Sequence, residues 1–213
     1  MNSFGRREAI DARDDAHPLR TAAPAPPTVT HRYWAPGAIL DQGPFPHCVG
    51  YAWAGWMLAS PTRTKTGPVP TDIYAAAQMV DEWDGENYDG TSVRAGAKVL
   101  ASQGRISEYL WAQSLAELQA WVLTKGPVVM GTEWYQGMSL LGVNGYATPA
   151  GALLGGHAYL CIGYSTARRA YRFLNSWGRV WGSPNGRFWM KEEDVADLLS
   201  RNGEACAAIE IPA

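Results

Sequence analysis

Three residues of this sequence carry the side chains needed for attack on a carbonyl group by sulfur. Cys48 stands where a turn rich in glycine and proline, residues 41–46, leads into an apolar stretch. A helix starting there would lower the pKa of the thiol through its positive end. His157 follows two glycines and offers a base, and Asn175 offers an amide that can fix the ring of that base. This set predicts catalysis by a nucleophilic thiolate.

Two further side chains complete the predicted site. Gln42 lies six residues before Cys48 and carries an amide donor of the kind that stabilises an oxyanion. Trp177 lies two residues after Asn175. We expect this indole to shield the hydrogen bond between Asn175 and His157 from water, because the bond would be weaker in water.

Simpler interpretations of the same residues stay open. Cys48 would be a buried structural thiol, which is also what we expect of Cys161 and Cys206, since three cysteines do not make a disulfide framework. Gln42 would cap a turn. His47, which directly precedes Cys48, would be the base in place of His157. No metal site is predicted, because the sequence has neither a CxxC nor an HxxxH spacing.

The elements that must position these residues fall into two halves of the chain. Apolar and capping patterns predict helices first, over residues 48–59 and 71–83, from Thr91 or Ser92 to Gly104, and from Ser114 to Gly126. Short β-prone runs follow at residues 127–134, 157–164, 170–176, 187–190 and 205–211, with one helix over 191–199. Helices followed by strands predict an α+β protein with segregated lobes and a cleft between them.

Length and charge limit the remaining classes of protein. A chain of 213 residues suits one domain built of two lobes, and 46% hydrophobic residues indicate a folded body. A formal net charge of −2 argues against binding of nucleic acid through its phosphates. No apolar run approaches the ~20 residues of a membrane span, and the N-terminus lacks the apolar stretch of a secretory signal. We therefore expect a cytoplasmic protein with neither a nucleic-acid nor a membrane partner.

Residues 1–30 differ in character from the domain expected over residues 31–213. They carry mixed charges, then Ala-Pro-Ala-Pro-Pro at residues 23–27, a composition that favours extended backbone. We expect an extended N-terminal arm. One hypothesis places this arm along the cleft as an autoinhibitory or self-processed segment, and the alternative is a disordered tail.

In order and spacing, the candidate catalytic residues and their neighbours resemble those of the papain family of cysteine peptidases, over roughly residues 41–190. The matching blocks are Gln-Gly at 42–43 ahead of Cys48, Gly-Gly-His-Ala at 155–158, Asn-Ser-Trp-Gly at 175–178, Trp-Gly at 181–182 and Asn-Gly at 185–186. The resemblance implies a papain-like two-lobed α+β fold. A helical lobe would span about 40–125 and an antiparallel β-barrel-like lobe about 126–213, with the active site in the cleft between them.

The same resemblance implies a role for each matching residue, and no cofactor. Cys48 would be the nucleophile, and His157 the base and then the acid. Asn175 would orient the imidazole, and Trp177 would cover the hydrogen bond between them. Gln42 and the backbone N–H of Cys48 would hold the oxyanion.

Four further residues would contact a polypeptide substrate. Gly90 would pair with the substrate backbone, which can come close because glycine has no Cβ. The pocket for the second residue upstream of the scissile bond would lie near Thr91, Ser92 and Ala158. The chain departs from the family at Phe45, where a disulfide-forming cysteine is usual, so we do not expect the secreted, disulfide-bonded form.

The function that follows is hydrolysis of peptide bonds. Two alternatives remain: a cysteine amidase or acyl transferase acting on cell-wall peptides, and a catalytically silent peptide-binding module on the same fold. Cell-wall enzymes of this kind usually lack the Asn-Ser-Trp-Gly block. A silent module has no reason to keep Gln42, Cys48, His157 and Asn175 together. The sequence leaves the natural substrate and the oligomeric state open.

Overall fold

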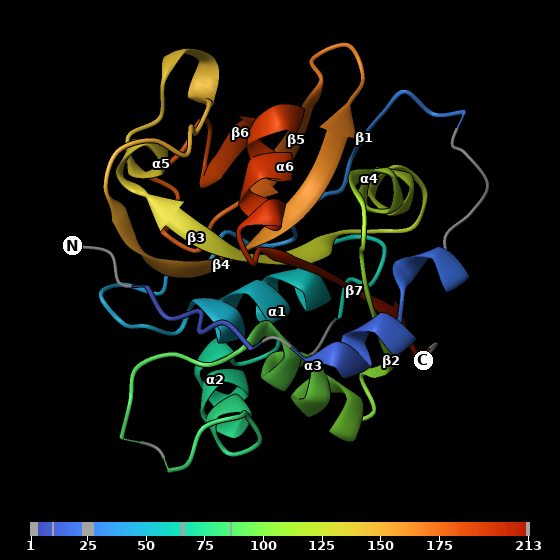
Figure 1. The fold of residues 1–213 in the computed structure, drawn as a ribbon, viewed down its shortest axis with the longest axis vertical. Helices are drawn as coiled ribbons and strands as arrows, with labels where there is room; N and C mark the ends of the chain where they lie inside the picture. The colour runs from blue at the N-terminus through green and yellow to red at the C-terminus, as the bar shows by residue number, and fades with distance from the viewer. Residues whose placement is uncertain (1–3, 10, 23–27, 65–66, 86, 212–213) are drawn as a thin grey trace.

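A computed structural model describes residues 4–9, 11–22, 28–64, 67–85 and 87–211 of the chain (Figure 1). The α-helices within these residues are α1 Cys48–Leu58, α2 Pro70–Gln78, α3 Val93–Ser102, α4 Leu115–Thr124, α5 Gln136–Ser139 and α6 Glu192–Ser200. The strands are β1 His31–Tyr33, β2 Ile106–Trp111, β3 Val128–Tyr135, β4 Leu153–Ser165, β5 Ala170–Leu174, β6 Arg187–Lys191 and β7 Glu204–Glu210. Short 3₁₀ turns are η1 Ala12–Ala16, η2 Leu19–Thr21 and η3 Val143–Gly145.

One antiparallel sheet forms the centre of the molecule. Its strands follow the order β2-β7-β3-β4-β5-β6, and β1 pairs with β4 outside this path. Helix α1 lies below the sheet in Figure 1, with α2 and α3 below it. The α+β class predicted from the sequence is confirmed, and the strands described form an open path rather than a closed barrel.

The side chains on the two faces of β4 pack into two separate cores, because side chains alternate along a strand. Tyr159 and Cys161 point into an aromatic core shared with β3, β5 and β6. Leu160 and Ile162 point into the core beneath the sheet, where α1 packs. Helix α1 is apolar nearly all round, and the sheet, α2 and α3 together cover it. This packing brings the N-terminus of α1 against the first half of β4.

Two helix starts form as the sequence predicts. The hydroxyl of Ser92 accepts a hydrogen bond from the backbone N–H of Ala95 at 3.0 Å and caps α3. The hydroxyl of Ser114 accepts from the N–H of Glu117 at 3.2 Å and caps α4. Both helices therefore begin where a local side-chain acceptor replaces the missing backbone partner.

The first residues of the chain differ from the extended arm that was expected. Residues 4–9 are extended, but η1 and η2 follow them, and Leu19 is fully buried in the aromatic core. Isolated parallel bridges join Arg6 to Thr91 and Pro18 to Trp111. In Figure 1 this segment crosses the molecule between the sheet and the helices α2 and α3. The Pro-rich residues 23–27 lie outside the described part of the chain.

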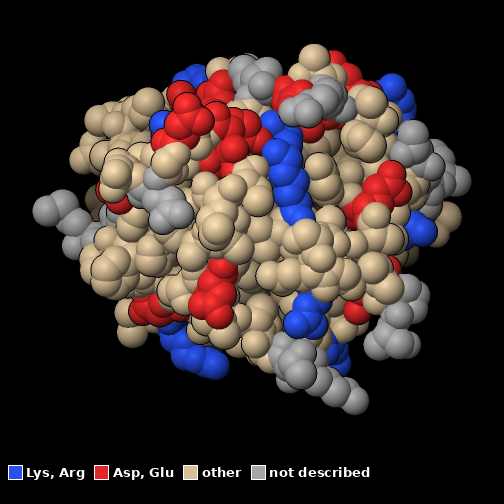
Figure 2. All heavy atoms as spheres, turned by 90° about the horizontal axis from the view of Figure 1, so that it is seen from below, with Lys and Arg blue, Asp and Glu red and all other residues tan. Residues whose placement is uncertain are grey.

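The surface carries charges of both signs. On the face seen from below, basic side chains lie among acidic ones, with several acidic side chains gathered near one edge (Figure 2). This mixture agrees with the formal net charge of −2. Within the described residues, none of the helices has the length and apolar character needed to cross a bilayer.

Candidate active site

The structure brings Cys48 and His157 to the same place. Cys48 is the first residue of α1, and its Sγ accepts a hydrogen bond from the backbone N–H of Ala158 at 3.4 Å. Ala158 follows His157 on β4, so the thiol lies against the residue next to the histidine although Cys48 and His157 are far apart in the sequence. Both side chains are fully buried.

The imidazole of His157 is held by an amide. Its Nε2 lies 2.8 Å from Oδ1 of Asn175, which directly follows β5. Because that oxygen can only accept, Nε2 carries the hydrogen and Nδ1 remains the basic nitrogen. Nδ1 is buried and has no hydrogen-bond partner among the described residues. The ring of Trp177 lies 4.8 Å from that of His157, centroid to centroid.

Burial keeps both Cys48 and His157 neutral in this arrangement. Desolvation raises the pKa of the Cys48 thiol to about 11, and the hydrogen bond from Ala158 and the backbone of Gly5 and Val49 offset this effect only in part. Desolvation also lowers the pKa of His157 to about 4, against the opposing effect of Asn175. The position of Cys48 at the start of a helix predicted a lowered thiol pKa. The pKa is raised instead, because the effect of burial is larger than that of the helix end. At neutral pH this form holds a thiol and a neutral imidazole.

Gln42 is fixed on both sides of its amide. Its Nε2 donates to the carbonyl of Phe45 at 2.7 Å, and its Oε1 accepts from the hydroxyl of Ser176 at 2.6 Å. Its backbone N–H donates to the carbonyl of Ser176 at 2.8 Å. These bonds join the turn before α1 to the segment after β5, so Gln42 and Asn175 are positioned by the same few residues.

The extended residues 4–9 occupy the space in front of the thiol. Backbone N–H of Thr91 donates to the carbonyl of Gly5, and the N–H of Arg7 donates to the carbonyl of Thr91, both at 2.9 Å. The N–H of Arg6 donates to the carbonyl of Gly156 at 2.9 Å. The arm therefore lies as a strand between the segment before α3 and β4, with backbone bonds to both sides.

Two arm residues lie next to His157 and Cys48. The ring of Phe4 lies 5.8 Å from that of His157 and 6.0 Å from that of Trp177. The backbone of Gly5 lowers the pKa of the Cys48 thiol, against the effect of burial. A Cβ on Gly5 would lie 1.8 Å from the carbonyl oxygen of Pro46, so only glycine allows the arm to pass this close.

The four residues expected to contact substrate make different contacts in this structure. Thr91, rather than Gly90, pairs with the arm through both of its backbone groups. The N–H of Gly90 donates to Tyr74 Oη at 2.9 Å, so its backbone is already bonded within the protein. Ala158 lies against the thiol, and Ser92 uses its hydroxyl to cap α3 and to donate to Glu82 at 2.8 Å.

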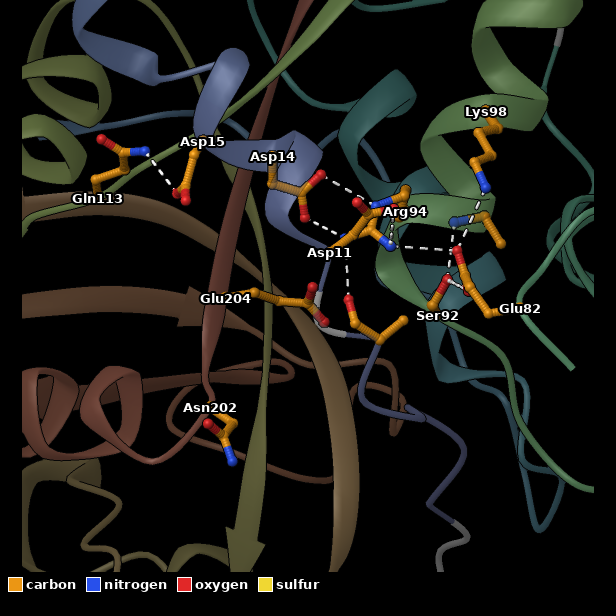
Figure 3. A network of polar contacts seen from close by, with 12 residues as sticks. Asp11, Asp14, Asp15, Glu82, Ser92, Arg94, Lys98, Gln113, Asn202 and Glu204 are labelled. Carbon is orange, nitrogen blue, oxygen red and sulfur yellow. Dashed lines mark hydrogen bonds and ion pairs between the residues drawn. The ribbon is translucent and has the colours of Figure 1, made fainter.

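A network of charges that the sequence analysis missed holds the arm to the body. Arg94 of α3, only 3% exposed, forms ion pairs with Asp11, Asp14 and Glu82 (Figure 3). Its Nη2 also donates to the carbonyl of Ala9 at 2.9 Å. The pairs with Asp11 and Asp14 join residues about 80 positions apart, so no local spacing in the sequence indicates them. Within the described residues, no group of three or more His, Cys, Asp or Glu side chains is arranged to hold a metal ion.

Comparison with known proteins relates this arrangement to one family. A family model described as papain family cysteine protease matches residues 70–207, which include His157 and Asn175 and begin after Cys48. A search of curated proteins found no match.

Three solved structures illustrate the fold. Xylellain, a cysteine protease from Xylella fastidiosa, has a TM-score of 0.77 and 21% identity, over 99% of this chain and 97% of that one. Digestive procathepsin L2 from the larval midgut of Tenebrio molitor has a TM-score of 0.66 and 16% identity, over 98% and 78%. A Carica candamarcensis cysteine protease in complex with E-64 has a TM-score of 0.61 and 15% identity, over 86% and 99%. At these identities the likeness establishes the fold.

Proposed function

Because the chain belongs to the papain family of cysteine proteases, we propose that it hydrolyses polypeptides by means of Cys48, His157, Asn175 and Gln42. One observation carries the assignment of residues. The Sγ of Cys48 lies 3.4 Å from the backbone nitrogen of Ala158, the residue after His157, and Nε2 of His157 is bonded to Oδ1 of Asn175. A thiol, a base and a group that orients the base thus converge at one place.

The reaction follows from this arrangement. Once the arm has left, Nδ1 of His157 takes the proton of Cys48, and Sγ of the resulting thiolate then forms a bond to the carbonyl carbon of the peptide. The N–H of Cys48 and the amide of Gln42 donate to the oxyanion that forms. The intermediate collapses by breaking the C–N bond, and His157 gives its proton to the departing amine. Water, deprotonated by His157, then attacks the thioester, which releases the acid and restores the thiol.

The assignment of the nucleophile is tested by replacing Cys48. In a chain lacking residues 1–9, we expect Cys48→Ala to abolish cleavage of an unfolded protein and labelling by a peptide epoxide. The matched variant Cys161→Ala, which removes another buried thiol, should keep both. Full activity of Cys48→Ala would contradict the assignment. Loss of peptidoglycan turbidity without cleavage of unfolded protein would favour the cell-wall alternative.

We further propose that the described form is self-inhibited by its N-terminal arm. Three contacts support this: Phe4 against His157, Gly5 against Cys48, and the backbone bridge between Arg6 and Thr91. Together they bury both reacting groups completely. A substrate strand cannot reach the thiol until these residues leave.

The test of self-inhibition compares the full chain with a chain lacking residues 1–9, which keeps η1, η2 and the buried Leu19. We expect the shortened chain to be more active on the same peptide. Mass spectrometry of the active preparation then shows whether the protein removes these residues itself. An intact N-terminus in the active preparation, together with equal activity of the two chains, would contradict the proposal.

A further inference from the structure

A cleft lined by two arginines lies where β1, β5 and β6 meet, and the proposed mechanism does not use it. In Figure 1 these strands lie in the upper part of the molecule, whereas α2 and α3 lie in the lower part. The cleft has a volume of about 470 Å³, within the ~300–1,000 Å³ typical of sites for small molecules. We call it the Arg172 cleft. The lining residues that matter below are Tyr33, Arg172, Pro184, Arg187 and Trp189.

Arg172 brings a buried guanidinium to the wall of this cleft. It lies on β5 between Tyr171 and Phe173, whose side chains enter the aromatic core on the other face of the sheet. Arg172 is only 8% exposed. Its Nη2 donates to the carbonyl of Ser183, whereas its Nη1 is buried and has no hydrogen-bond partner among the described residues. A buried donor without a partner is unfavourable, so an acceptor supplied by a ligand is favoured at this point.

A second cation stands beside Arg172. The half-buried Arg187 lies on β6, two residues before Trp189, which pairs with Arg172 across the sheet. Its Nη1 donates to the carbonyl of Pro184 at 3.3 Å. Within the described residues, no carboxylate forms an ion pair with either arginine. Burial, and next the charge of Arg187, lower the pKa of Arg172 to about 10, so Arg172 stays charged at neutral pH and repels its neighbour. An anion between the two is therefore favoured.

The other side chains of the cleft are aromatic or apolar. The rings of Trp189 and Tyr33 stand edge to face, with centroids 5.6 Å apart. The guanidinium carbon of Arg172 lies 4.8 Å from the centroid of the Trp189 ring, and that of the exposed Arg168 lies 5.0 Å from it. Tyr33 is 47% exposed, so its ring is open to a ligand. Aromatic rings beside cations suit a ligand with a flat or apolar body and an anionic group.

We propose that the Arg172 cleft binds a small phosphate monoester whose organic part is flat or apolar. Such an ester carries about 1.5 to 2 negative charges at neutral pH, which matches Arg172 and Arg187 together, and its oxygens suit the planar fork of arginine. The organic part lies against Tyr33 and Trp189. Because Nη1 of Arg172 is covered in this structure, a neighbouring side chain turns as the ligand enters, a change that is common on binding. The inference is independent of the proposed peptidase function.

The test measures binding of phenyl phosphate to the full chain by titration calorimetry. Phenyl phosphate joins the proposed anionic group to a flat ring, inorganic phosphate has the anionic group alone, and benzyl alcohol has the ring without the charge. We expect phenyl phosphate to bind at one site per chain and more tightly than either of the other two. Absence of binding at millimolar concentrations would overturn the proposal. Equal affinity for inorganic phosphate would also overturn it, because the aromatic walls would then contribute nothing.

Two variants locate the bound ester. Arg187→Gln should weaken the binding of phenyl phosphate about 10- to 100-fold, because it removes a charge-assisted hydrogen bond. Arg172→Gln should weaken it at least as much, and circular dichroism checks that this variant folds. If it does not fold, the half-buried Arg187 decides the test, since its replacement disturbs the core less.

The matched control is Arg105→Gln, which removes the same charge from an exposed residue just before β2 and should leave the affinity unchanged. Unchanged affinity in the Arg187→Gln chain would overturn the assignment to this cleft. An equal loss in Arg105→Gln and Arg187→Gln would also overturn it, because the ester would then respond to the overall charge of the protein and not to a built site.

Discussion

At the residue scale, Gln42 is held ready before any substrate arrives. Its amide is bonded to Phe45 on one side and to Ser176 on the other, so its donor needs little reorganisation during the reaction. We expect Gln42→Ala, in the chain lacking residues 1–9, to lower kcat about 10²- to 10³-fold and to change KM much less. Steady-state kinetics on one peptide measures both. Gln113→Ala on the exposed surface is the control, and an equal loss there would contradict the role.

The state of the thiol gives a second prediction at this scale. With a pKa of about 11, Cys48 in the full chain is a thiol at neutral pH, and its thiolate fraction rises only as the pH approaches 11. Removal of residues 1–9 lets water in and allows the thiolate to pair with protonated His157, which lowers that pKa. Iodoacetamide labelling of Cys48 should then be fast at neutral pH in the shortened chain only. The same pH profile in both chains would count against the role of the arm.

The residues that the sequence could predict differ in kind from those it could not. Cys48, His157 and Asn175 lie in short blocks whose local pattern is distinctive, so the sequence alone selects them as candidates. Arg6 and Glu204 stand in no pattern, because their contact exists only after the arm and β7 have come together. Long-range charge pairs of this sort leave no spacing in the sequence.

At the element scale, the helices and strands that the sequence predicts also differ in kind from those that it does not predict. The apolar run of α1 and the caps of α3 and α4 carry their own local signals, so these helices were predicted within a few residues. No element was predicted over β2, which follows Gly104 and pairs with β7 through a shifted register. β1, of three residues, pairs with β4 alone and is defined by its partner. Such strands depend on tertiary pairing more than on propensity.

Element η1 supplies the next prediction, since it carries the acids that hold the arm to α3. Asp14 bonds the buried guanidinium of Arg94, whereas its neighbour Asp15 accepts a hydrogen bond from Gln113 at the surface, at 3.1 Å. A charge-assisted bond contributes about 1.5–3 kcal/mol, so Asp14→Asn should raise the activity of the full chain about tenfold or more by freeing the arm. Asp15→Asn should leave it unchanged. Equal rates for both variants, measured on one peptide, would contradict the anchoring role of Asp14.

At the scale of the whole molecule, the N-terminal segment belongs to both halves of the structure. Its first part, residues 4–9, lies over the reacting groups at the boundary between α3 and β4. Its later part carries Leu19 into the aromatic core beside α4. The segment therefore occludes the site with one part and stabilises the fold with the other, and the two effects are separable.

That separation predicts opposite outcomes for two substitutions of similar size. Leu19→Ala removes a fully buried side chain and should lower the free energy of unfolding by about 2–5 kcal/mol, while Phe4 and Gly5 still cover the thiol and basal activity stays low. Phe4→Ala removes a partly exposed ring that touches His157 and Trp177, so activity should rise with a smaller loss of stability. Denaturant unfolding and peptide hydrolysis, measured on both full-length variants, give the comparison. If Leu19→Ala frees the site as much as Phe4→Ala does, the arm acts as one cooperative unit, and the division into two parts is wrong.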